Sequence, residues 1–409
     1  MSDKLLTSKE KYAYYEYIYK RKLHRSATWA SLSSFAGVFA LSIYLLCHLC
    51  FSDKAVSSVY TDKIFYYINY PLAKLFGYIP FSVAELLLYV FIICTVVFLF
   101  KTIYATVETV MLYFRMKKQG YYPERRSMLR PAGNLGLRFV SVFCIIVTVF
   151  IFFGGINYTG MTFSEKAEYT ADNYTVEQLR QFCYIMGKNV SETRQALETK
   201  IDGSIDEAYS EYNPYKLAEE AKKAYNLLPQ KYNSSHTDYP TVKFAYSSIV
   251  MSNIHITGIY PYILPEAIVN IHTPIMSLPH TICHEMAHQR GFAREDEANF
   301  IAYMACLQSD NPIFAYSAYY TAFSYAMDEL RYYDTKTWTA IMDSVDKDVK
   351  KDISRENAYW SQFETLSHEF TSGVNDTYLS VMNVEDGVKN YGKVVELLLT
   401  EAIQSGVIK

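Results

Sequence analysis

Three long apolar segments constrain what this 409-residue chain can fold into more than any other feature of its sequence. They run roughly over Trp29–Phe51, Phe81–Tyr104 and Gly136–Asn157. Each is long enough to cross the ~30 Å hydrocarbon core of a bilayer, which takes about 20 helical residues. The first is too long, and lies too far along the chain, to be a signal peptide. The sequence therefore predicts a membrane domain with three transmembrane helices over residues 1–157, followed by a globular domain over residues 158–409.

The positions of lysine and arginine predict how these segments are oriented. Basic residues cluster before the first span, at Lys4, Lys9, Lys11, Lys20, Arg21, Lys22 and Arg25, and again in the second loop, at Arg115, Lys117, Lys118, Arg125, Arg126, Arg130 and Arg138. The first loop, about residues 52–80, holds only Lys54, Lys63 and Lys74, offset by Asp53 and Asp62. Because cytoplasmic loops carry the excess of Lys and Arg, we expect a multi-pass protein of the cell membrane with a cytoplasmic N-terminus and an extracytoplasmic globular domain. A net charge of −3 gives no reason to expect a nucleic-acid partner.

The globular region contains the pentapeptide His284-Glu285-Met286-Ala287-His288. On a helix, residues four apart lie on one face, so His284 and His288 can reach a single metal ion. Glu285 can then lean over the open position of the metal and take a proton from water there. Such a motif arises by chance in roughly one chain in a hundred, so an ordinary helix with two surface histidines is the alternative.

The residues that follow the pentapeptide strengthen the metal interpretation. Gly291 is a natural stop for the first helix, because glycine takes the left-handed conformation that other residues resist. A second helix is expected to begin at the acid-rich turn Glu295-Asp296-Glu297, where the helix dipole favours carboxylates. Two helices joined in this way can present two imidazoles and a carboxylate to one ion. Three protein ligands and water are typical of catalytic zinc.

The run from Glu295 to Asn299 resembles the E-x-x-[AS]-[DN] pattern of the gluzincin group of zinc peptidases. The resemblance implies that Glu295 is the third ligand and that Asn299, one turn along, orients a ligating histidine. Thermolysin-like enzymes usually carry Asp at that position. Glu297 is the alternative third ligand.

Two neighbouring residues are not expected to bind the metal. A metzincin pattern, HExxHxxGxxH, matches through Gly291 but places Arg294 at the third-ligand position, where a protonated guanidinium cannot bind metal. We expect Arg294 to pair with a carboxylate or with substrate. His280, one turn before His284, follows Pro279 at the start of the helix and is interpreted as a capping or surface residue.

The order of elements predicts an α+β fold for this domain. Helical periodicity covers residues 174–200 and 204–227, and β-branched or alternating runs at Thr241–Ser248 and Ala267–His272 indicate strands before the helices that start at His280. Strands before the HExxH helix and helices around it are the order of a zincin architecture, here mostly helical with a small sheet. The segment Glu266–Asn270 is expected to be the strand at the edge of a cleft or an ordinary interior strand.

A resemblance extends along nearly the whole chain. Three N-terminal spans, the HExxH stretch and the later segment from Tyr378 to Val395 are similar to an uncharacterised bacterial multi-pass membrane-protein family (domain of unknown function) of the HExxH zinc-peptidase superfamily. The resemblance implies a class and a membrane placement but no substrate.

The function expected from the sequence is a membrane-anchored zinc metallopeptidase that acts on a peptide or protein substrate in the bacterial envelope. Zn²⁺ would be held by His284, His288 and Glu295, with Glu285 as general base. Two alternatives stay open: a zinc hydrolase of a non-peptide envelope amide, and a catalytically silent zinc-containing envelope scaffold.

Two further features of the site stay open in the sequence. The oxyanion of an acyl-transfer reaction needs a donor, and the candidates are Tyr316, Tyr319, Tyr320, Tyr325, Tyr391, Arg331 and His368. Cys183, Cys283 and Cys306 have no metal-type spacing, and we expect no disulfide framework, although a Cys283–Cys306 bridge is conceivable.

Overall fold

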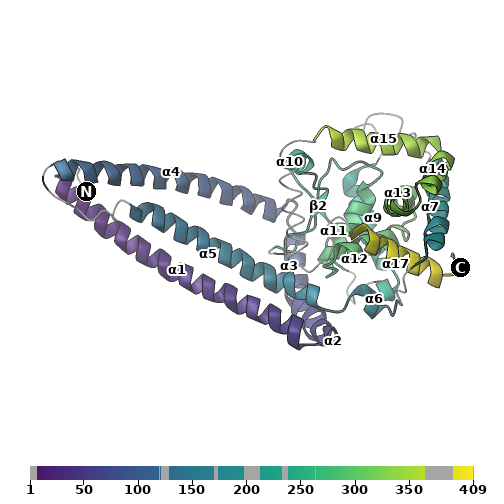
Figure 1. Cartoon of the computed structure of the whole chain (residues 1–409), viewed down its shortest axis with the longest axis horizontal. Coiled ribbons are helices and arrows are strands. Elements are labelled where there is room, and N and C mark those ends of the chain that lie inside the picture. Colours follow the sequence, from purple (N-terminus) through teal and green to yellow (C-terminus); the bar gives the residue numbers. More distant parts are fainter. Residues whose placement is uncertain are drawn as a thin grey trace. The chain divides into compact units, whose positions relative to one another are not determined.

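The structure of the protein is a computed structural model. It describes residues 7–118, 120, 129–169, 174–197, 212–232, 238–262, 264–363 and 390–408. These residues are mostly helical, with one small three-stranded sheet. The chain forms two compact units (Figure 1), one of Met1–Phe51 with Ala84–Ile156 and the other of Ser52–Val83 with Asn157–Lys409.

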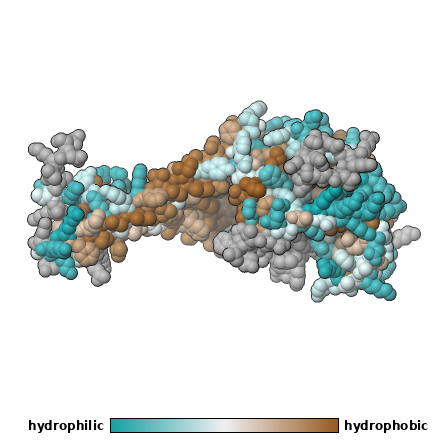
Figure 2. All heavy atoms as spheres, turned by 90° about the horizontal axis from the view of Figure 1, so that it is seen from above, coloured by the Kyte–Doolittle hydropathy of each residue, from teal (hydrophilic) through white to brown (hydrophobic). Residues whose placement is uncertain are grey.

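The first unit contains three long helices, α1 (Ser8–Cys50), α4 (Val83–Lys118) and α5 (Arg130–Phe153). All three are long and apolar enough to cross a membrane, as the sequence predicts. Figure 2 shows hydrophobic residues along the middle stretch of this unit and hydrophilic residues at its far end. The helix α1 starts well before the predicted span because Thr7 and Glu10 form a capping box.

Helices α1 and α5 pack along each other inside this first unit. Their contacts are polar as well as apolar: the Ser26 hydroxyl donates to Asn134 Oδ1 at 2.5 Å, and Arg130 pairs with Glu16 at 3.2 Å. Helices in lipid associate through such small and polar side chains, because lipid gives no hydrophobic reason to hide the apolar ones.

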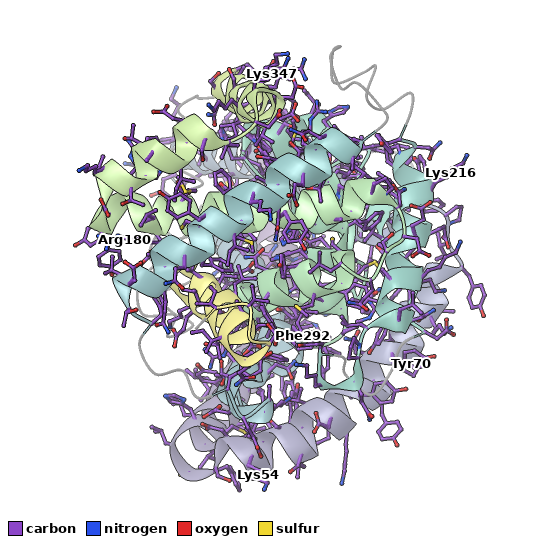
Figure 3. The ribbon with its side chains drawn as sticks, turned by 90° about the vertical axis from the view of Figure 1, so that its right-hand side faces the viewer. Lys54, Tyr70, Arg180, Lys216, Phe292 and Lys347 are labelled. Atoms are coloured by element: carbon purple, nitrogen blue, oxygen red, sulfur yellow. The ribbon has the colours of Figure 1, made fainter. Side chains whose placement is uncertain are left out.

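The second unit is built around a continuous apolar core. Its helices are α2 (Asp53–Val56), the π-helix η1 (Ser57–Phe65), α3 (Tyr66–Gly77), α6 (Phe163–Lys166), α7 (Val176–Ala196), α9 (Pro214–Leu227), α10 (Ser248–Asn253), α11 (Leu278–Gln289), α12 (Glu295–Cys306), α13 (Pro312–Tyr333), α14 (Thr335–Ser344), α15 (Lys347–Ser361) and α17 (Asn390–Gln404), with 3-10 turns η3 (Gly155–Thr159) and η4 (Gln230–Tyr232). Charged residues such as Arg180, Lys216 and Lys347 lie at the periphery (Figure 3).

The two helices expected near residues 174–227 are present with defined starts. Helix α7 begins after Thr175, whose side chain forms a capping box with Gln178. Helix α9 begins at Pro214, with Asn213 as its N-cap. Residues 204–211, expected to belong to this second helix, lie outside the described residues.

The sheet has the order β1-β3-β2, with β1 at Lys243–Phe244, β2 at Gly258–Ile259 and β3 at Ile268–Val269. Strand β3 pairs parallel to β1 and antiparallel to β2, in the register Gly258↔Val269. Of the two interpretations of Glu266–Asn270, the interior strand is therefore the correct one. The edge strands are β1 and β2, and the sequence analysis did not identify β2.

The segment between the first two candidate spans belongs to the second unit. Residues 52–83 group with residues 157–409 and not with α1, α4 and α5. Lys243 and Glu266 form a buried ion pair. The donors and acceptors that the two side chains do not use on each other also need partners, and residues 76–83 supply them. Lys243 donates to the carbonyls of Phe76 and Phe81, each at 2.9 Å. Glu266 accepts from the Ser82 hydroxyl and from the Val83 amide, and so caps the start of α4.

Candidate metal centre

The helix α11 that carries the HExxH motif ends in a glycine turn, as predicted. Gly291 has φ +97°, its amide donates to the His288 carbonyl at 3.0 Å, and the Phe292 amide donates to the Ala287 carbonyl at 3.2 Å. This pair of bonds is a Schellman motif, which satisfies the last carbonyls of the helix. The turn brings the chain back so that α12 begins at Glu295, beside the two histidines.

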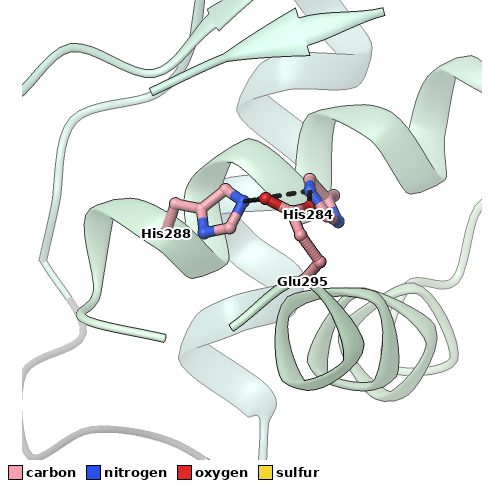
Figure 4. A group of neighbouring side chains, drawn as sticks. All are labelled: His284, His288 and Glu295. Atoms are coloured by element: carbon pink, nitrogen blue, oxygen red, sulfur yellow. Dashed lines mark hydrogen bonds and ion pairs between the residues drawn. The ribbon is translucent and has the colours of Figure 1, made fainter. Parts of the chain in front are cut away.

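Three side chains converge where the two helices meet: His284, His288 and Glu295 (Figure 4). The Nε2 atoms of the two histidines lie 3.1 Å apart. Glu295 places one carboxylate oxygen 3.2 Å from His284 Nε2 and the other 3.5 Å from His288 Nε2. These are the two histidines and the carboxylate that the sequence singles out, and the structure brings all three together.

The spacing of these atoms fits a tetrahedral divalent cation. Ligand atoms held about 2.1 Å from zinc at tetrahedral angles lie about 3.4 Å from one another. The three separations are of this size: 3.1 Å between the two Nε2 atoms, 3.2 Å from His284 Nε2 to one Glu295 oxygen, and 3.5 Å from His288 Nε2 to the other oxygen. The side chain of Glu295 is partly exposed, while that of His288 is buried. Two imidazoles and a carboxylate are also a donor set that zinc prefers.

A main-chain carbonyl orients one of the two histidines. His288 Nδ1 lies 2.7 Å from the carbonyl oxygen of Phe292, which follows Gly291 in the turn. An Nδ1–H donated to this oxygen leaves Nε2 free to bind metal, which is the usual arrangement for a ligating histidine. The Nδ1 atom of His284 is buried without a hydrogen-bond partner in the structure.

Asn299, expected to orient a histidine, has a different environment. Its side-chain oxygen accepts a hydrogen bond from the Tyr325 hydroxyl at 3.2 Å. Its backbone carbonyl faces His280 Nε2 at 3.2 Å. Among the described residues no hydrogen bond joins the Asn299 side chain to His284 or His288. The Phe292 carbonyl thus occupies, for His288, the position in which Asn299 was expected.

Glu285 lies buried beside the cluster, against the edge strand β2. A Cβ atom at Gly258 of β2 would overlap its carboxylate, so this position of the strand accommodates only glycine without a shift. The Oε2 atom of Glu285 is buried without a hydrogen-bond partner in the structure. A buried, unpartnered carboxylate oxygen costs stability and is therefore a candidate for function. Sequence reasoning missed Gly258, because its strand is only two residues long.

The charges of the cluster shift several pKa values. Burial raises the pKa of Glu285 to about 7, although the nearby histidines act in the opposite direction. For His288, burial favours the neutral ring, but the charge and hydrogen bond of Glu295 outweigh it and raise the pKa to about 9. Burial likewise acts to raise the pKa of Glu295, yet the two histidines hold it well below its usual range. Without metal, the cluster is thus a protonated His288 paired with an ionised Glu295.

The alternative third ligand, Glu297, points away from the histidines. Its carboxylate accepts a hydrogen bond from the Phe163 amide at 2.6 Å, at the start of α6, and burial raises its pKa to about 7. Arg294 lies 4.0 Å from this carboxylate and donates to the Tyr158 carbonyl at 3.0 Å. The prediction that Arg294 pairs with a neighbouring carboxylate is confirmed.

The interpretation of His280 as a capping or surface residue is wrong. Its side chain is buried, because α11 is surrounded by other helices on the side that His280 faces. Burial lowers its pKa to about 3, with His284 adding to the effect, so the ring is neutral. It is a neighbour of the cluster rather than a member of it.

Two of the seven oxyanion candidates form hydrogen bonds away from the cluster. Tyr316 and Tyr320 donate to Asp352 and Glu356 of α15, each at 2.7 Å. Tyr325, through its bond to Asn299, approaches the helix that begins with Glu295. The side chain of Tyr391 and all of His368 lie outside the described residues.

The cysteines take no part in the cluster. Cys183, Cys283 and Cys306 are buried free thiols in the structure. Burial raises the pKa of the Cys306 thiol, which neighbours Cys283, and a raised pKa makes a thiol less reactive.

The sequence profile of the family described as "Protein of unknown function (DUF3810)" matches residues 60–399, which is most of the chain. This match agrees with the resemblance to a family of unknown function. No curated protein and no solved structure matches the sequence. A function for the cluster must therefore be argued from its geometry.

Proposed function

This chain belongs to the DUF3810 family, and we propose that it is a membrane-anchored zinc-dependent metallopeptidase of the HExxH gluzincin type. The observation that carries the proposal is the triangle of His284 Nε2, His288 Nε2 and a Glu295 carboxylate, with edges of 3.1 to 3.5 Å. When bound, zinc supplies Lewis acidity, which activates water and polarises a carbonyl. A buried carboxylate, Glu285, lies beside this triangle.

Residues of the chain itself transfer the proton and hold the histidine and the base in position. Glu285 takes a proton from the attacking water and returns it to the leaving amine, because its carboxylate is buried beside the histidines and one of its oxygens has no hydrogen-bond partner in the structure. The Phe292 carbonyl holds the His288 ring in the tautomer that leaves Nε2 available. Strand β2 keeps Glu285 in place through the close contact at Gly258.

The proposal also includes a location. We place the N-terminus in the cytoplasm and the metal centre outside the cytoplasmic membrane, because lysine and arginine cluster before the first span and in the second loop. The candidate spans α1, α4 and α5 form the membrane anchor, and the unit of residues 52–83 and 157–409 carries the centre. Its substrate would be a peptide or protein of the envelope.

The test is a comparison of purified full-length variants reconstituted in lipid nanodiscs. Metal content and cleavage of a mixed peptide library are measured for wild type, Glu285→Gln and Glu295→Gln. We expect about one zinc per chain in wild type and Glu285→Gln, and loss of zinc in Glu295→Gln. Cleavage by Glu285→Gln should fall by about 10²- to 10⁴-fold, the usual contribution of a general base.

A matched control is Glu297→Gln, which alters a buried glutamate two residues from Glu295 but outside the triangle. It should keep its zinc. Zinc lost from Glu297→Gln but not from Glu295→Gln would reverse the assignment of the third ligand. Zinc bound without cleavage of any peptide would favour a non-peptide envelope amide as substrate, or a silent scaffold, and wild type without zinc would refute the proposal.

A further inference from the structure

The helix α3 carries an apolar stripe on its outer side. Tyr67, Ile68, Pro71, Leu75 and Tyr78 recur at intervals of three and four residues, which places them on one face. All five are exposed, with Tyr67 at 71%, Leu75 at 59% and Tyr78 at 86%. Single exposed apolar residues are ordinary, but a contiguous stripe without a charged residue marks an interaction surface.

The position of α3 in the chain indicates which partner covers the stripe. Only Phe51 and Ser52 separate the candidate span α1 from α2, and only residues 78–82 separate α3 from the candidate span α4. Five extended residues reach about 17 Å at most, so the end of α3 cannot lie much farther than that from the start of α4. A segment tethered so briefly at both ends to helices that cross a bilayer must lie at the bilayer surface.

The composition of the stripe fits this surface. Tyrosine rings are enriched at the level of the lipid headgroups, where one end of the ring meets hydrocarbon and the other meets water. Lys63, in the π-helix just before α3, is exposed, and a lysine beside an apolar face can extend its charged end towards headgroups, whereas Lys74 of α3 pairs with Asp238. An apolar face flanked by lysine is typical of helices that lie in the interface plane.

The opposite face of the same helix contacts the end of the motif helix α11. Asn69 is buried, donates to the Gln289 carbonyl at 3.5 Å and accepts from the Tyr260 hydroxyl at 3.0 Å. Phe65, just before α3, packs beside Gly291, where a Cβ atom would lie 3.6 Å from its ring. One helix therefore carries an outward apolar stripe and an inward face that touches the residues next to His288.

From these contacts we infer that α3 is an interfacial helix whose stripe Tyr67, Ile68, Pro71, Leu75 and Tyr78 inserts into the outer boundary of the lipid bilayer. The inference rests on the proposed membrane placement of α1 and α4, and it does not depend on zinc binding or on peptidase activity. It assigns to the first loop a role in attaching the globular unit to the membrane, in addition to the spans.

Tryptophan fluorescence in nanodiscs tests the inference on the full chain. Tyr67→Trp is compared with Tyr332→Trp, which alters an equally exposed tyrosine at the end of α13. Both are made in a background in which the three native tryptophans, Trp29, Trp338 and Trp360, are replaced by phenylalanine, so that the introduced tryptophan is the only source of the signal. The discs contain phosphatidylcholine, either unmodified or brominated near the top of its acyl chains, because bromine quenches tryptophan on contact.

Since interfacial helices bury their apolar face about 5–10 Å into this boundary, brominated lipid should quench the Tyr67→Trp emission by about half or more and leave Tyr332→Trp nearly unchanged. Leu75→Trp repeats the measurement about two helical turns further along α3, in case Tyr67→Trp does not fold. Water-exposed emission from both α3 variants would overturn the inference. Blue-shifted emission without quenching would overturn it too, because protein rather than lipid would then cover the stripe.

Discussion

The two compact units of this protein bury opposite kinds of side chain. In the helices α1, α4 and α5, large apolar residues such as Phe35, Phe100 and Phe143 are exposed, while Ser26 and Asn134 are buried against each other. In the second unit the apolar residues form the core, and buried charged residues include the ion pairs Arg194–Asp352 and Lys243–Glu266. Whether an exposed apolar side chain is unfavourable therefore depends on whether water or lipid surrounds it.

The same difference predicts unequal energies for buried polar groups in the two units. In a water-soluble core an unpaired charge has no alternative partner, so breaking a pair is expensive. In lipid the separated helices find other partners before they associate, so interhelical hydrogen bonds contribute little. Four predictions test this contrast, beginning with the largest effect.

The largest loss of stability is expected at Asp352 of α15. This carboxylate is fully buried and binds Arg194 Nε at 2.6 Å, with Arg355 at 3.2 Å on its other oxygen. Asp352→Ala leaves the Arg194 guanidinium buried without its partner and should lower the free energy of unfolding by about 3–5 kcal/mol. The control is Asp348→Ala on the same helix, whose exposed pair with Lys351 should contribute less than about 1 kcal/mol.

Denaturant titration of the full chain, followed by near-ultraviolet circular dichroism, measures both variants. An Asp352→Ala variant no less stable than Asp348→Ala would contradict the expected cost of an unpaired charge in this core.

The second prediction concerns pH and the metal. Zinc must displace the proton of His288, whose pKa without metal is about 9, so the apparent zinc affinity should rise about tenfold per pH unit from 7 to 9, about 2.7 kcal/mol in all. The metal-free protein should respond in the opposite direction. Since the histidine pKa is raised on folding, its stabilising pair with Glu295 is complete below about pH 6.5 and is lost as pH rises through about 9.

Competition with a chelator at several pH values measures the affinity, and thermal unfolding of the metal-free protein measures the stability. Zinc affinity independent of pH in this range would show that His288 is not a proton-bearing ligand.

The third prediction exchanges glycine for alanine in each unit. Gly258→Ala places a methyl group against the Glu285 carboxylate and should cost about 1–3 kcal/mol as an overpacked site. Gly136→Ala in α5 meets nothing within 4 Å and should stabilise its helix by about 0.5–1 kcal/mol. Midpoints of thermal unfolding for the two variants should therefore move in opposite directions. Equal shifts would contradict the expected difference between a crowded glycine at position 258 and an open one at position 136.

The smallest effect is expected from the buried hydrogen bond of the first unit. Ser26→Ala removes the bond to Asn134 and should change the stability of the helix pair by only about 0.6 kcal/mol, the average for such bonds in membranes. Steric trapping or force spectroscopy in bicelles can resolve a change of this size. A loss as large as that of Asp352→Ala would mean that the first unit behaves like a water-soluble core.

The features that the sequence predicted correctly depend on local rules. The spans follow from length and composition, the end of α11 follows from the left-handed preference of Gly291, and the start of α12 follows from its three acidic residues. The meeting of His284, His288 and Glu295 could be anticipated because helix periodicity and one tight turn fix most of its geometry.

The features that sequence analysis missed depend on contacts between distant segments. Strand β2 is only two residues long, too short for a periodic signal, and its place at the sheet edge is decided by pairing with Val269. The packing of residues 52–83 with the globular unit depends on Glu266 and Lys243, more than 150 positions along the chain. No rule of local spacing relates such residues.

The atom that orients His288 belongs to the main chain. Replacing Phe292 by any other residue leaves its carbonyl in place, so an alanine scan would pass over this contact and assign the position no role in the metal centre. Substitutions can change the side chain at position 292 while the main-chain oxygen keeps the His288 ring in its orientation. The contact is vulnerable instead at Gly291, where any side chain strains the left-handed backbone that aims the oxygen. Gly291, which contributes no side chain, would thus be the residue on which the geometry of the candidate metal site depends.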